Sequence, residues 1–222
     1  MEKIVLKKEW SVALRINHWA MALSIFILIA TGFYIADPFT VSSGETVHKF
    51  LMGNVRYMHI LFGTVLVFLF LWRVYLAFFS RFHADWKDFF AWADVKATVE
   101  QIKFYLLIRK EAPEHKMLYG PLQSLAYVGL MFMVFVIVVT GLILMGAGYH
   151  AGLTAICYKI LRPIENMMGG LAVVRYVHHL FTWFFVLFIV AHIYMAFWID
   201  AVTKEGQLSS MVNGYIIKKE KK

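Results

Sequence analysis

The stretch RYVHHLFTWFFVLFIVAH, residues 175–192, decides the fold, because it carries one arginine and three histidines within a long apolar run. Across the chain, 61% of the 222 residues are hydrophobic. Only 16% are charged, whereas soluble domains have roughly 25% charged residues. The composition therefore predicts an all-α integral membrane protein in which a few polar side chains lie among apolar helices.

Four apolar runs are long enough for a membrane crossing, which needs about 20 residues. They predict transmembrane helices at 16–36, 57–79, 122–147 and 173–199. The first run follows a basic segment and has no small-residue cleavage site after a short apolar core, so we interpret it as a retained span and not as a signal peptide. We expect one membrane domain, residues 1–222, folded as a four-transmembrane-helix bundle.

The distribution of basic residues predicts the orientation of this bundle. The net charge is +8, and the Lys and Arg residues concentrate before the first span, in the loop 80–121 and in the tail 200–222. By the positive-inside rule these segments and both termini are cytoplasmic. The basic residues do not form one face with interleaved aromatic residues, so we expect a membrane lipid environment and no nucleic-acid partner.

The connections between the spans differ in character. Residues 94–108 carry apolar residues at helical spacing with charges between them, a pattern typical of an interfacial amphipathic helix or, equally, of a solvated connector. The connections 37–56 and 148–172 face the other side. Gly and Pro residues in them, such as Pro163 and Gly169-Gly170, predict turns.

The chain has a single cysteine, Cys157. One cysteine cannot form an internal disulfide, a four-thiolate iron–sulfur site or a Cys-x-x-Cys-His attachment of covalent haem. Any redox cofactor must therefore use other ligands.

Helical geometry sorts the histidines into pairs. His178 and His192 are 14 residues apart, so they share a face and are separated by a rise of about 21 Å, whereas His179 points about 140° away from His192. His18 begins the first span on the cytoplasmic side, and His59 begins the second span on the outer side. The depths match in an outer pair, His59 with His178, and an inner pair, His18 with His192.

Paired imidazoles from two helices at one depth are the axial ligands that low-spin haem iron uses. A single intramembrane histidine is explained as well by a hydrogen bond to a neighbouring helix or by a wet cavity. Two depth-matched pairs favour two haem b groups, with each of these four histidines as an iron ligand. The remaining histidines lie in connections or on another face and are not predicted ligands: His48, His83, His115, His150 and His179.

Arginine and glycine residues add to this pattern. Arg15, Arg56 and Arg175 each precede a histidine of the two pairs by three residues, on the same helix face. Arg56 and Arg175 lie on the outer side, where each needs an anionic partner, either a haem propionate or a phospholipid phosphate. Arg15 also fits an ordinary cytoplasmic anchor. Gly32 and Gly63 would let a porphyrin approach the backbone or would serve helix packing.

With these motifs in place, nearly the whole chain resembles the b-type cytochrome subunit of membrane-bound nickel–iron hydrogenases. The resemblance rests on RINHW (15–19) with TG (31–32), MGNVRYMH (52–59), VHHLFTW (177–183) with His192, and SMVNGY (210–215). The two-haem, four-helix pattern alone is also similar to the cytochrome subunits of formate dehydrogenases and thiosulfate reductases, which stay as the alternative. The MGNVR stretch and the SMVNGY tail favour the hydrogenase subunit.

The resemblance implies a quinone-reducing subunit of a hydrogen:quinone oxidoreductase in the bacterial inner membrane. Electrons would come from the iron–sulfur small subunit of the hydrogenase, pass from the outer to the inner haem and reach menaquinone or ubiquinone. The chain itself would not split hydrogen, because it lacks the cysteines for a nickel site. Its partners would be the small and large hydrogenase subunits, and a higher-order oligomer of the complex is compatible with this reading.

For quinone contacts, the resemblance points to Tyr119 and Gln123, with His115 as a further donor. Gly120 stands where related subunits often have Asn, so Gly120-Pro121 also reads as a simple helix start.

Two other classes of function compete with electron transfer. A metal or proton transporter would use the histidines to bind ions or relay protons, and it predicts more polar or acidic residues within the spans. A structural membrane anchor would require no buried histidines.

Overall fold

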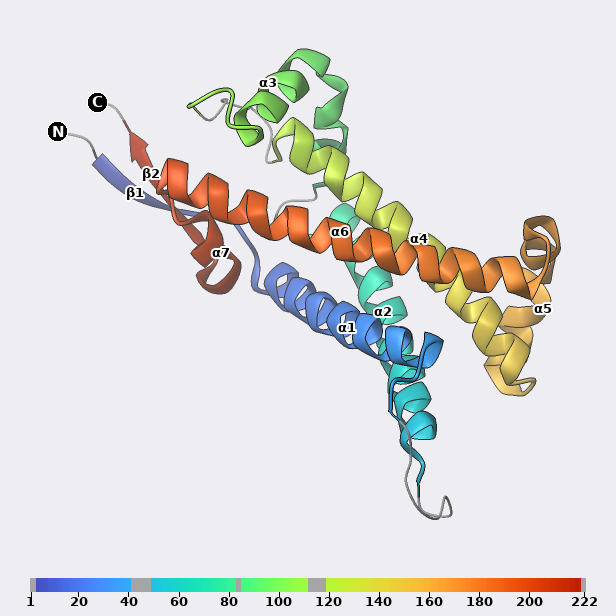
Figure 1. Cartoon of the computed structure of the whole chain (residues 1–222). Coiled ribbons are helices and arrows are strands. Elements are labelled where there is room, and N and C mark those ends of the chain that lie inside the picture. Colours follow the sequence, from blue (N-terminus) through green and yellow to red (C-terminus); the bar gives the residue numbers. More distant parts are fainter. Residues whose placement is uncertain (1–2, 41–48, 83–84, 112–118, 221–222) are drawn as a thin grey trace. The chain divides into compact units, whose positions relative to one another are not determined.

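Four long apolar helices dominate the computed structural model, which describes residues 3–40, 49–82, 85–111 and 119–220 (Figure 1). Each is long and apolar enough to cross a membrane, and each contains one of the predicted spans. The prediction of a helical membrane protein with four candidate spans is thus confirmed. The four helices are α1 (Val12–Ala36), α2 (Leu51–Phe79), α4 (Pro121–Gly148) and α6 (Leu171–Thr203).

The ends of these helices follow from local sequence. α1 stops at Ala36, and the Asp37-Pro38 pair that follows disfavours helical backbone at the residue before the proline. α4 begins with Pro121, whose missing N–H costs nothing in the first helical turn.

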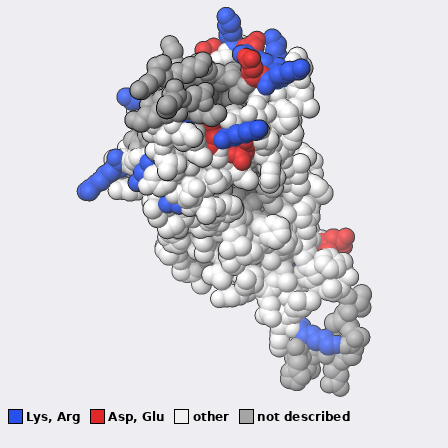
Figure 2. Space-filling model, turned by 90° about the vertical axis from the view of Figure 1, so that its left-hand side faces the viewer, with Lys and Arg blue, Asp and Glu red and all other residues white. Residues whose placement is uncertain are grey.

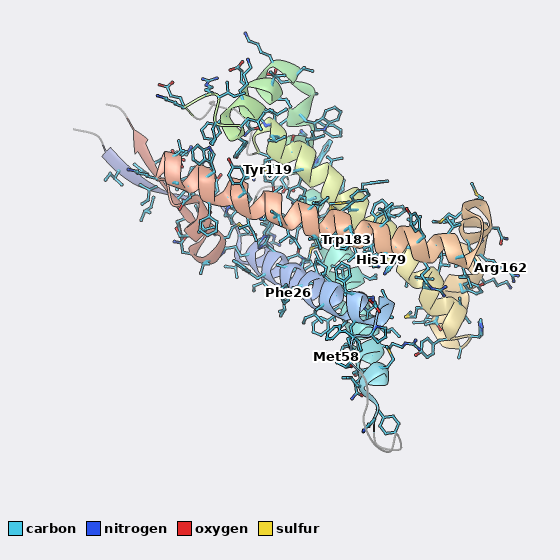
Figure 3. The ribbon with its side chains drawn as sticks, viewed as in Figure 1. Phe26, Met58, Tyr119, Arg162, His179 and Trp183 are labelled. Atoms are coloured by element: carbon cyan, nitrogen blue, oxygen red, sulfur yellow. The ribbon has the colours of Figure 1, made fainter. Side chains whose placement is uncertain are left out.

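The surfaces of the long helices are apolar, as contact with lipid requires. The side chains of Phe26, Phe68 and Leu187 are between 64% and 70% exposed. Figure 3 labels Phe26 on α1. On the face drawn in Figure 2, the charged side chains gather mainly at the upper end, with a few near the lower end, and a broad area without charge lies between. Burial inside the protein thus supplies only part of the apolar contact that these helices make.

The chain divides into two compact units, and the first comprises residues 1–19, 72–132 and 187–222. Beside parts of the long helices it contains the 3₁₀ helix η1 (Asp85–Ala93), α3 (Val95–Tyr105) and α7 (Gln207–Asn213). The strands β1 (Lys3–Lys8) and β2 (Tyr215–Glu220) pair antiparallel, with Lys8 opposite Tyr215. Figure 1 shows this sheet next to the two termini. The sequence analysis did not predict it.

α3 covers most of the segment 94–108 in which a helix was one of two expectations. The Asp94 side chain accepts a hydrogen bond from the Ala97 N–H at 3.0 Å and so caps the helix start. Gln101 and Phe104 are buried, whereas Val95 and Ile102 on the same helix are exposed. The helix is amphipathic, and its position at the membrane interface stays a prediction.

The second unit comprises residues 20–71 and 133–186 and contains a helix that the sequence analysis missed, α5 (Gly152–Met168). The predicted turn at Pro163 was wrong, because Pro163 lies inside α5. Gly169 does end the helix, with a positive φ of 97°, and the N–H groups of Gly169 and Gly170 bond to the carbonyls of Asn166 and Glu165. The core of this unit includes the fully buried side chains of Val134, Ile143 and Val174.

Candidate functional site

His18 of α1 and His192 of α6 face each other within the first unit. Their ring centroids are 6.2 Å apart, with an angle of 50° between the ring planes. Phe188, one turn before His192, stacks on the His192 ring at 5.7 Å and 9°. Trp19 lies edge-on to the His18 ring at 5.2 Å. The two imidazoles are therefore held among aromatic rings without touching one another.

His59 of α2 and His178 of α6 form an equivalent pair within the second unit. Their ring centroids are 6.3 Å apart and the ring planes make an angle of 68°. The two pairs are those expected from helical spacing and depth. Within the described ranges, no group of three or more His, Cys, Asp or Glu side chains is arranged to hold a metal ion.

The separation within each pair fits one metal ion between two imidazoles. Such imidazoles stand about 6 Å apart between ring centroids, because each metal–nitrogen bond is about 2.0 Å and each ring centroid lies about 1.1 Å beyond its nitrogen. The observed 6.2 and 6.3 Å agree with this value. The residues present therefore fit the axial ligation of haem.

Two threonines contact Nδ1 of the outer histidines, and their other hydrogen bonds favour one tautomer of each imidazole. Thr31 donates its hydroxyl proton to the Ile27 carbonyl at 2.7 Å, and its oxygen lies 2.8 Å from Nδ1 of His59. A hydroxyl has one proton, so with that proton on the Ile27 carbonyl Thr31 accepts a hydrogen bond from His59. The proton of His59 is then on Nδ1, and Nε2 carries the lone pair that a metal requires.

The same arrangement recurs at His178. Thr140 donates to the Val136 carbonyl at 2.7 Å, and its oxygen lies 2.9 Å from Nδ1 of His178. Both histidines of the outer pair thus present Nε2, and each is oriented by the hydrogen bond that its Nδ1–H donates to a threonine of another helix, as is usual for metal-binding imidazoles.

The glycine after each threonine makes room for the histidine. A Cβ added at Gly32 would lie 3.2 Å from Cε1 of His59, and one at Gly141 would lie 3.3 Å from Cε1 of His178. The space at Gly32 therefore serves the His59 ring itself. A Cβ at Gly63 would meet only Leu28, at 4.0 Å.

The predicted propionate partners have different surroundings. Arg56 and Arg175 are exposed, each one turn from a histidine of the outer pair. Arg15 donates through its Nη1 to the Val212 carbonyl of α7. Its Nε is buried, and no hydrogen-bond partner among the described residues reaches it. That nitrogen, one turn from His18, is a buried donor that calls for an acceptor.

The C-terminal motif 210–215 packs against the start of α1 in the first unit. The indole N–H of Trp19 donates to the Met211 carbonyl at 2.9 Å, and that of Trp10 donates to the Ser210 hydroxyl at 3.1 Å. Gly214 has φ of 90°, and a Cβ there would lie 3.0 Å from the Trp10 carbonyl oxygen. The tail is therefore a structural neighbour of the inner histidine pair.

His179 lies apart from the outer pair, although it adjoins His178 in sequence. Its ring packs edge-on against Phe33 of α1 at 5.6 Å, and Phe33 also packs against Trp183. Figure 3 labels His179 and Trp183 on α6. His150 is exposed and lies 6.0 Å from the Tyr158 ring. His48, His83 and His115 fall outside the described residues, so His115 as a quinone contact stays a prediction.

Of the two quinone candidates, Tyr119 is buried in a polar cluster of the first unit and Gln123 is exposed on α4. The Tyr119 hydroxyl donates to Asp85 of η1, and Asp85 pairs with Arg73 of α2 at 2.6 Å. Arg73 also donates to the hydroxyl of Tyr127. Burial, with Tyr127 and Asp85 as further causes, raises the pKa of Tyr119 well above its usual value, so the hydroxyl remains protonated and donating.

Gly120 has a structural role at the start of α4. Its missing side chain leaves room for the amide of Gln101 from α3, whose oxygen accepts from the Leu122 N–H at 2.6 Å. Gln101 thereby satisfies one of the free N–H groups at the helix start.

Sequence reasoning missed Thr140, Gly141 and the Arg73–Asp85 ion pair. The dipeptide Thr-Gly occurs at both 31–32 and 140–141, a repeat that could have marked the two histidine supports. Arg73 lies within the predicted span 57–79, where a charge calls for a partner. Its partner Asp85 could not have been identified from spacing, because it lies beyond the end of the helix.

Comparison with known proteins shows what the chain is similar to. Residues 9–214 match the family described as prokaryotic cytochrome b561. A probable Ni/Fe-hydrogenase B-type cytochrome subunit from Azotobacter chroococcum mcd 1 is 34% identical, covering 91% of this chain and 85% of that protein. The corresponding protein of Rhodobacter capsulatus is 30% identical over 90% of this chain and 78% of its own length. A probable Ni/Fe-hydrogenase 1 B-type cytochrome subunit from Escherichia coli K12 is 26% identical, with 96% and 92% covered.

Proposed function

The chain belongs to the prokaryotic cytochrome b561 family, and from that premise we propose that it is the b-type cytochrome subunit of a nickel–iron hydrogenase, carrying electrons through the membrane to quinone. The printed descriptions of its relatives support the hydrogenase assignment over a formate or thiosulfate enzyme. The chain itself performs no hydrogen chemistry.

The proposal rests on the two histidine pairs, in which the ring centroids are 6.2 Å apart for His18 and His192 and 6.3 Å apart for His59 and His178. His18 and His192 hold one haem b, and His59 with His178 hold the other. A haem b held by two histidines would supply a one-electron relay. The chain's task is to fix the ligands, exclude water and orient the redox groups.

Individual residues divide this task. Thr31 and Thr140 keep the protons of the outer histidines on Nδ1, so that Nε2 binds iron. Gly32 and Gly141 admit the imidazole rings. Arg56 and Arg175 would pair with anionic groups of one haem, and Arg15, whose buried Nε has no partner among the described residues, would do so at the other.

The quinone site lies beside the inner pair, on the cytoplasmic side. Of the two predicted contacts, Gln123 has the exposed side chain and donates to a quinone carbonyl. Tyr119 contributes indirectly, because its hydroxyl is committed to Asp85. Menaquinone and ubiquinone both offer the carbonyl that this contact requires.

The proposed setting is the bacterial inner membrane, with both termini, residues 80–121 and the tail 200–222 in the cytoplasm. The hydrogenase small subunit delivers electrons from the outer face, and the large subunit carries the nickel site. Hydrogen oxidation outside and quinone protonation inside would then separate charge across the membrane. The same proposal includes the association of several copies of the complex into a larger oligomer.

Electron delivery can be tested with the chain co-purified with its partner enzyme and reconstituted into quinone-containing vesicles. Hydrogen gas is expected to reduce both haems and then the quinone, whereas formate is not. Haem reduction by formate, with a formate dehydrogenase as the co-purified partner, would overturn the hydrogenase assignment. The proposal that the chain transfers electrons through its haems would stand.

Thr31→Val is expected to raise the midpoint potential of one haem by about 40 mV, for a hydrogen bond worth about 1 kcal/mol. The threonine oxygen accepts from Nδ1 of His59 and makes the imidazole a stronger donor to oxidised iron. Valine keeps the shape and loses the acceptor. A potentiometric titration followed by visible spectroscopy measures the change.

Thr64→Val in α2 is the matched control. The Thr64 hydroxyl also donates to a carbonyl four residues back, that of Ile60 at 2.9 Å, but it supports no histidine of the two pairs. It should leave both potentials unchanged. Equal potentials in the Thr31 variant and the wild type would remove Thr31 from the proposed ligand support.

A further inference from the structure

α5 connects α4 to α6 through very short links. Only residues 149–151 separate it from Gly148, and only Gly169 and Gly170 separate it from Leu171. Both neighbouring helices are long and apolar enough to span a membrane. Three residues reach about 10 Å at full extension, so α5 has to lie near the level at which these spans leave the bilayer.

One side of α5 is an exposed apolar stripe. Its members fall within about 80° of one another on an ideal helix. Their exposed fractions run from 39% to 88%, so within the described residues nothing covers them fully. The stripe consists of Leu153, Ile156, Ile160, Ile164 and Met167.

A second side of α5 packs on the protein. Gly146 of α4 lets α5 come close, because a Cβ there would lie 2.5 Å from Cβ of Tyr158 and 3.0 Å from the Thr154 carbonyl oxygen. Glu165, only 8% exposed, lies on the same side and shares a hydrogen bond with the Tyr158 hydroxyl. This packing fixes the rotation of the helix, so the apolar stripe cannot turn inward.

The third side is polar. Lys159, Arg162 and Asn166 are exposed and lie between the stripe and the packed side on the helical wheel. Figure 3 labels Arg162 on α5. α5 thus has one face for the protein, one that is polar and cationic, and one that is apolar, which is the division found in helices that lie in a membrane interface.

We propose that α5 is a lipid-binding element that lies flat in the outer membrane interface. The apolar stripe enters the boundary between headgroups and acyl chains, and Lys159 and Arg162 reach the phosphates of phospholipid headgroups. Lipid is the occupant because the short links keep the stripe at the bilayer surface. The cations beside the stripe also complement phosphate charge, and long basic side chains readily extend to that level.

The full chain can report this through single spin labels, because Cys157 is its only cysteine. In a Cys157→Ser background, Ile160→Cys and Arg162→Cys place labels on the apolar and the polar side of α5. The protein is reconstituted into vesicles of phosphatidylcholine with one quarter phosphatidylglycerol, and label collisions with oxygen and with a water-soluble nickel chelate are compared. We expect oxygen to dominate at position 160 and the chelate to dominate at position 162.

A label at 160 that is open to the chelate would place the stripe in water and overturn the proposal. A label closed to both reagents would mean that protein covers the stripe, either a second copy or a partner subunit, and would also overturn it. Ile160→Trp tests the same point without a label. Lipids brominated on their acyl chains are expected to quench its added fluorescence, and the absence of quenching would contradict lipid burial.

Discussion

His178→Ala is expected to leave one haem b in place of two and to reduce hydrogen-driven quinone reduction by more than about 100-fold. Loss of an outer-shell partner alone costs a metal site about 10–100-fold, and here an axial ligand itself is removed. His178 faces His59 at 6.3 Å between ring centroids. The missing haem should be the one whose other ligand is His59, so His59→Ala should give the same spectrum.

His179→Ala is the control for this prediction, because it changes the neighbouring histidine on the same helix. The His179 ring packs against Phe33 and takes no part in either pair. This variant should keep both haems and near-normal electron transfer. Loss of a haem in the His179 variant, with both retained in the His178 variant, would show that the ligand on α6 was wrongly assigned.

Asp85→Ala is expected to reduce the free energy of unfolding by roughly 3–5 kcal/mol, the cost of leaving one member of a buried ion pair unpaired. The pair is enclosed, with side-chain exposures of 4% for Arg73 and 1% for Asp85. Tyr119 would lose its acceptor at the same time. Denaturation of the purified protein in mixed detergent micelles, followed by circular dichroism, measures the loss.

Two further variants separate the charge effect from lost packing. Glu111→Ala removes an exposed acid from the same connection and should be neutral. The double variant Arg73→Met with Asp85→Leu removes both charges and should recover more than half of the lost stability, because an apolar pair needs no partner. A double variant as unstable as Asp85→Ala would mean that packing and the tyrosine contacts dominate over the charges.

The helical membrane fold was predictable because its signal is local. Each span is a run of consecutive apolar residues, and the 14-residue spacing between His178 and His192 follows from helix geometry alone. Matching depths then limited the partners of these two histidines to His18 and His59. The rings lie in those two pairs, and their role as iron ligands stays a prediction.

The rest depended on contacts between distant residues. β1 pairs with β2 across almost the whole chain, and no local pattern identifies such a partner. Arg73 signalled a need for a counter-charge without indicating Asp85. The sequence around Thr140 gives no sign of a special role, because its contact with His178 forms only when α4 packs beside α6.

α5 was not predicted for a different reason, because its sequence contains turn residues as well as a helical period. Pro163 and the following glycines suggested turns, although the apolar residues from Leu153 to Met167 recur at helical spacing. Proline costs a helix about 3 kcal/mol when it lies in the interior, but the close packing of α5 on α4 at Gly146 can offset that loss. Only the glycines past the end of α5 act as a stop.

The central claim is that this chain holds two haem b groups between two histidine pairs, and counting haem tests it most directly. A redox difference spectrum of the purified chain, combined with acid extraction and quantification of non-covalent haem per polypeptide, gives the number. The account predicts two b haems. No haem in a properly folded chain, or a single haem that survives the loss of either histidine pair, would contradict it.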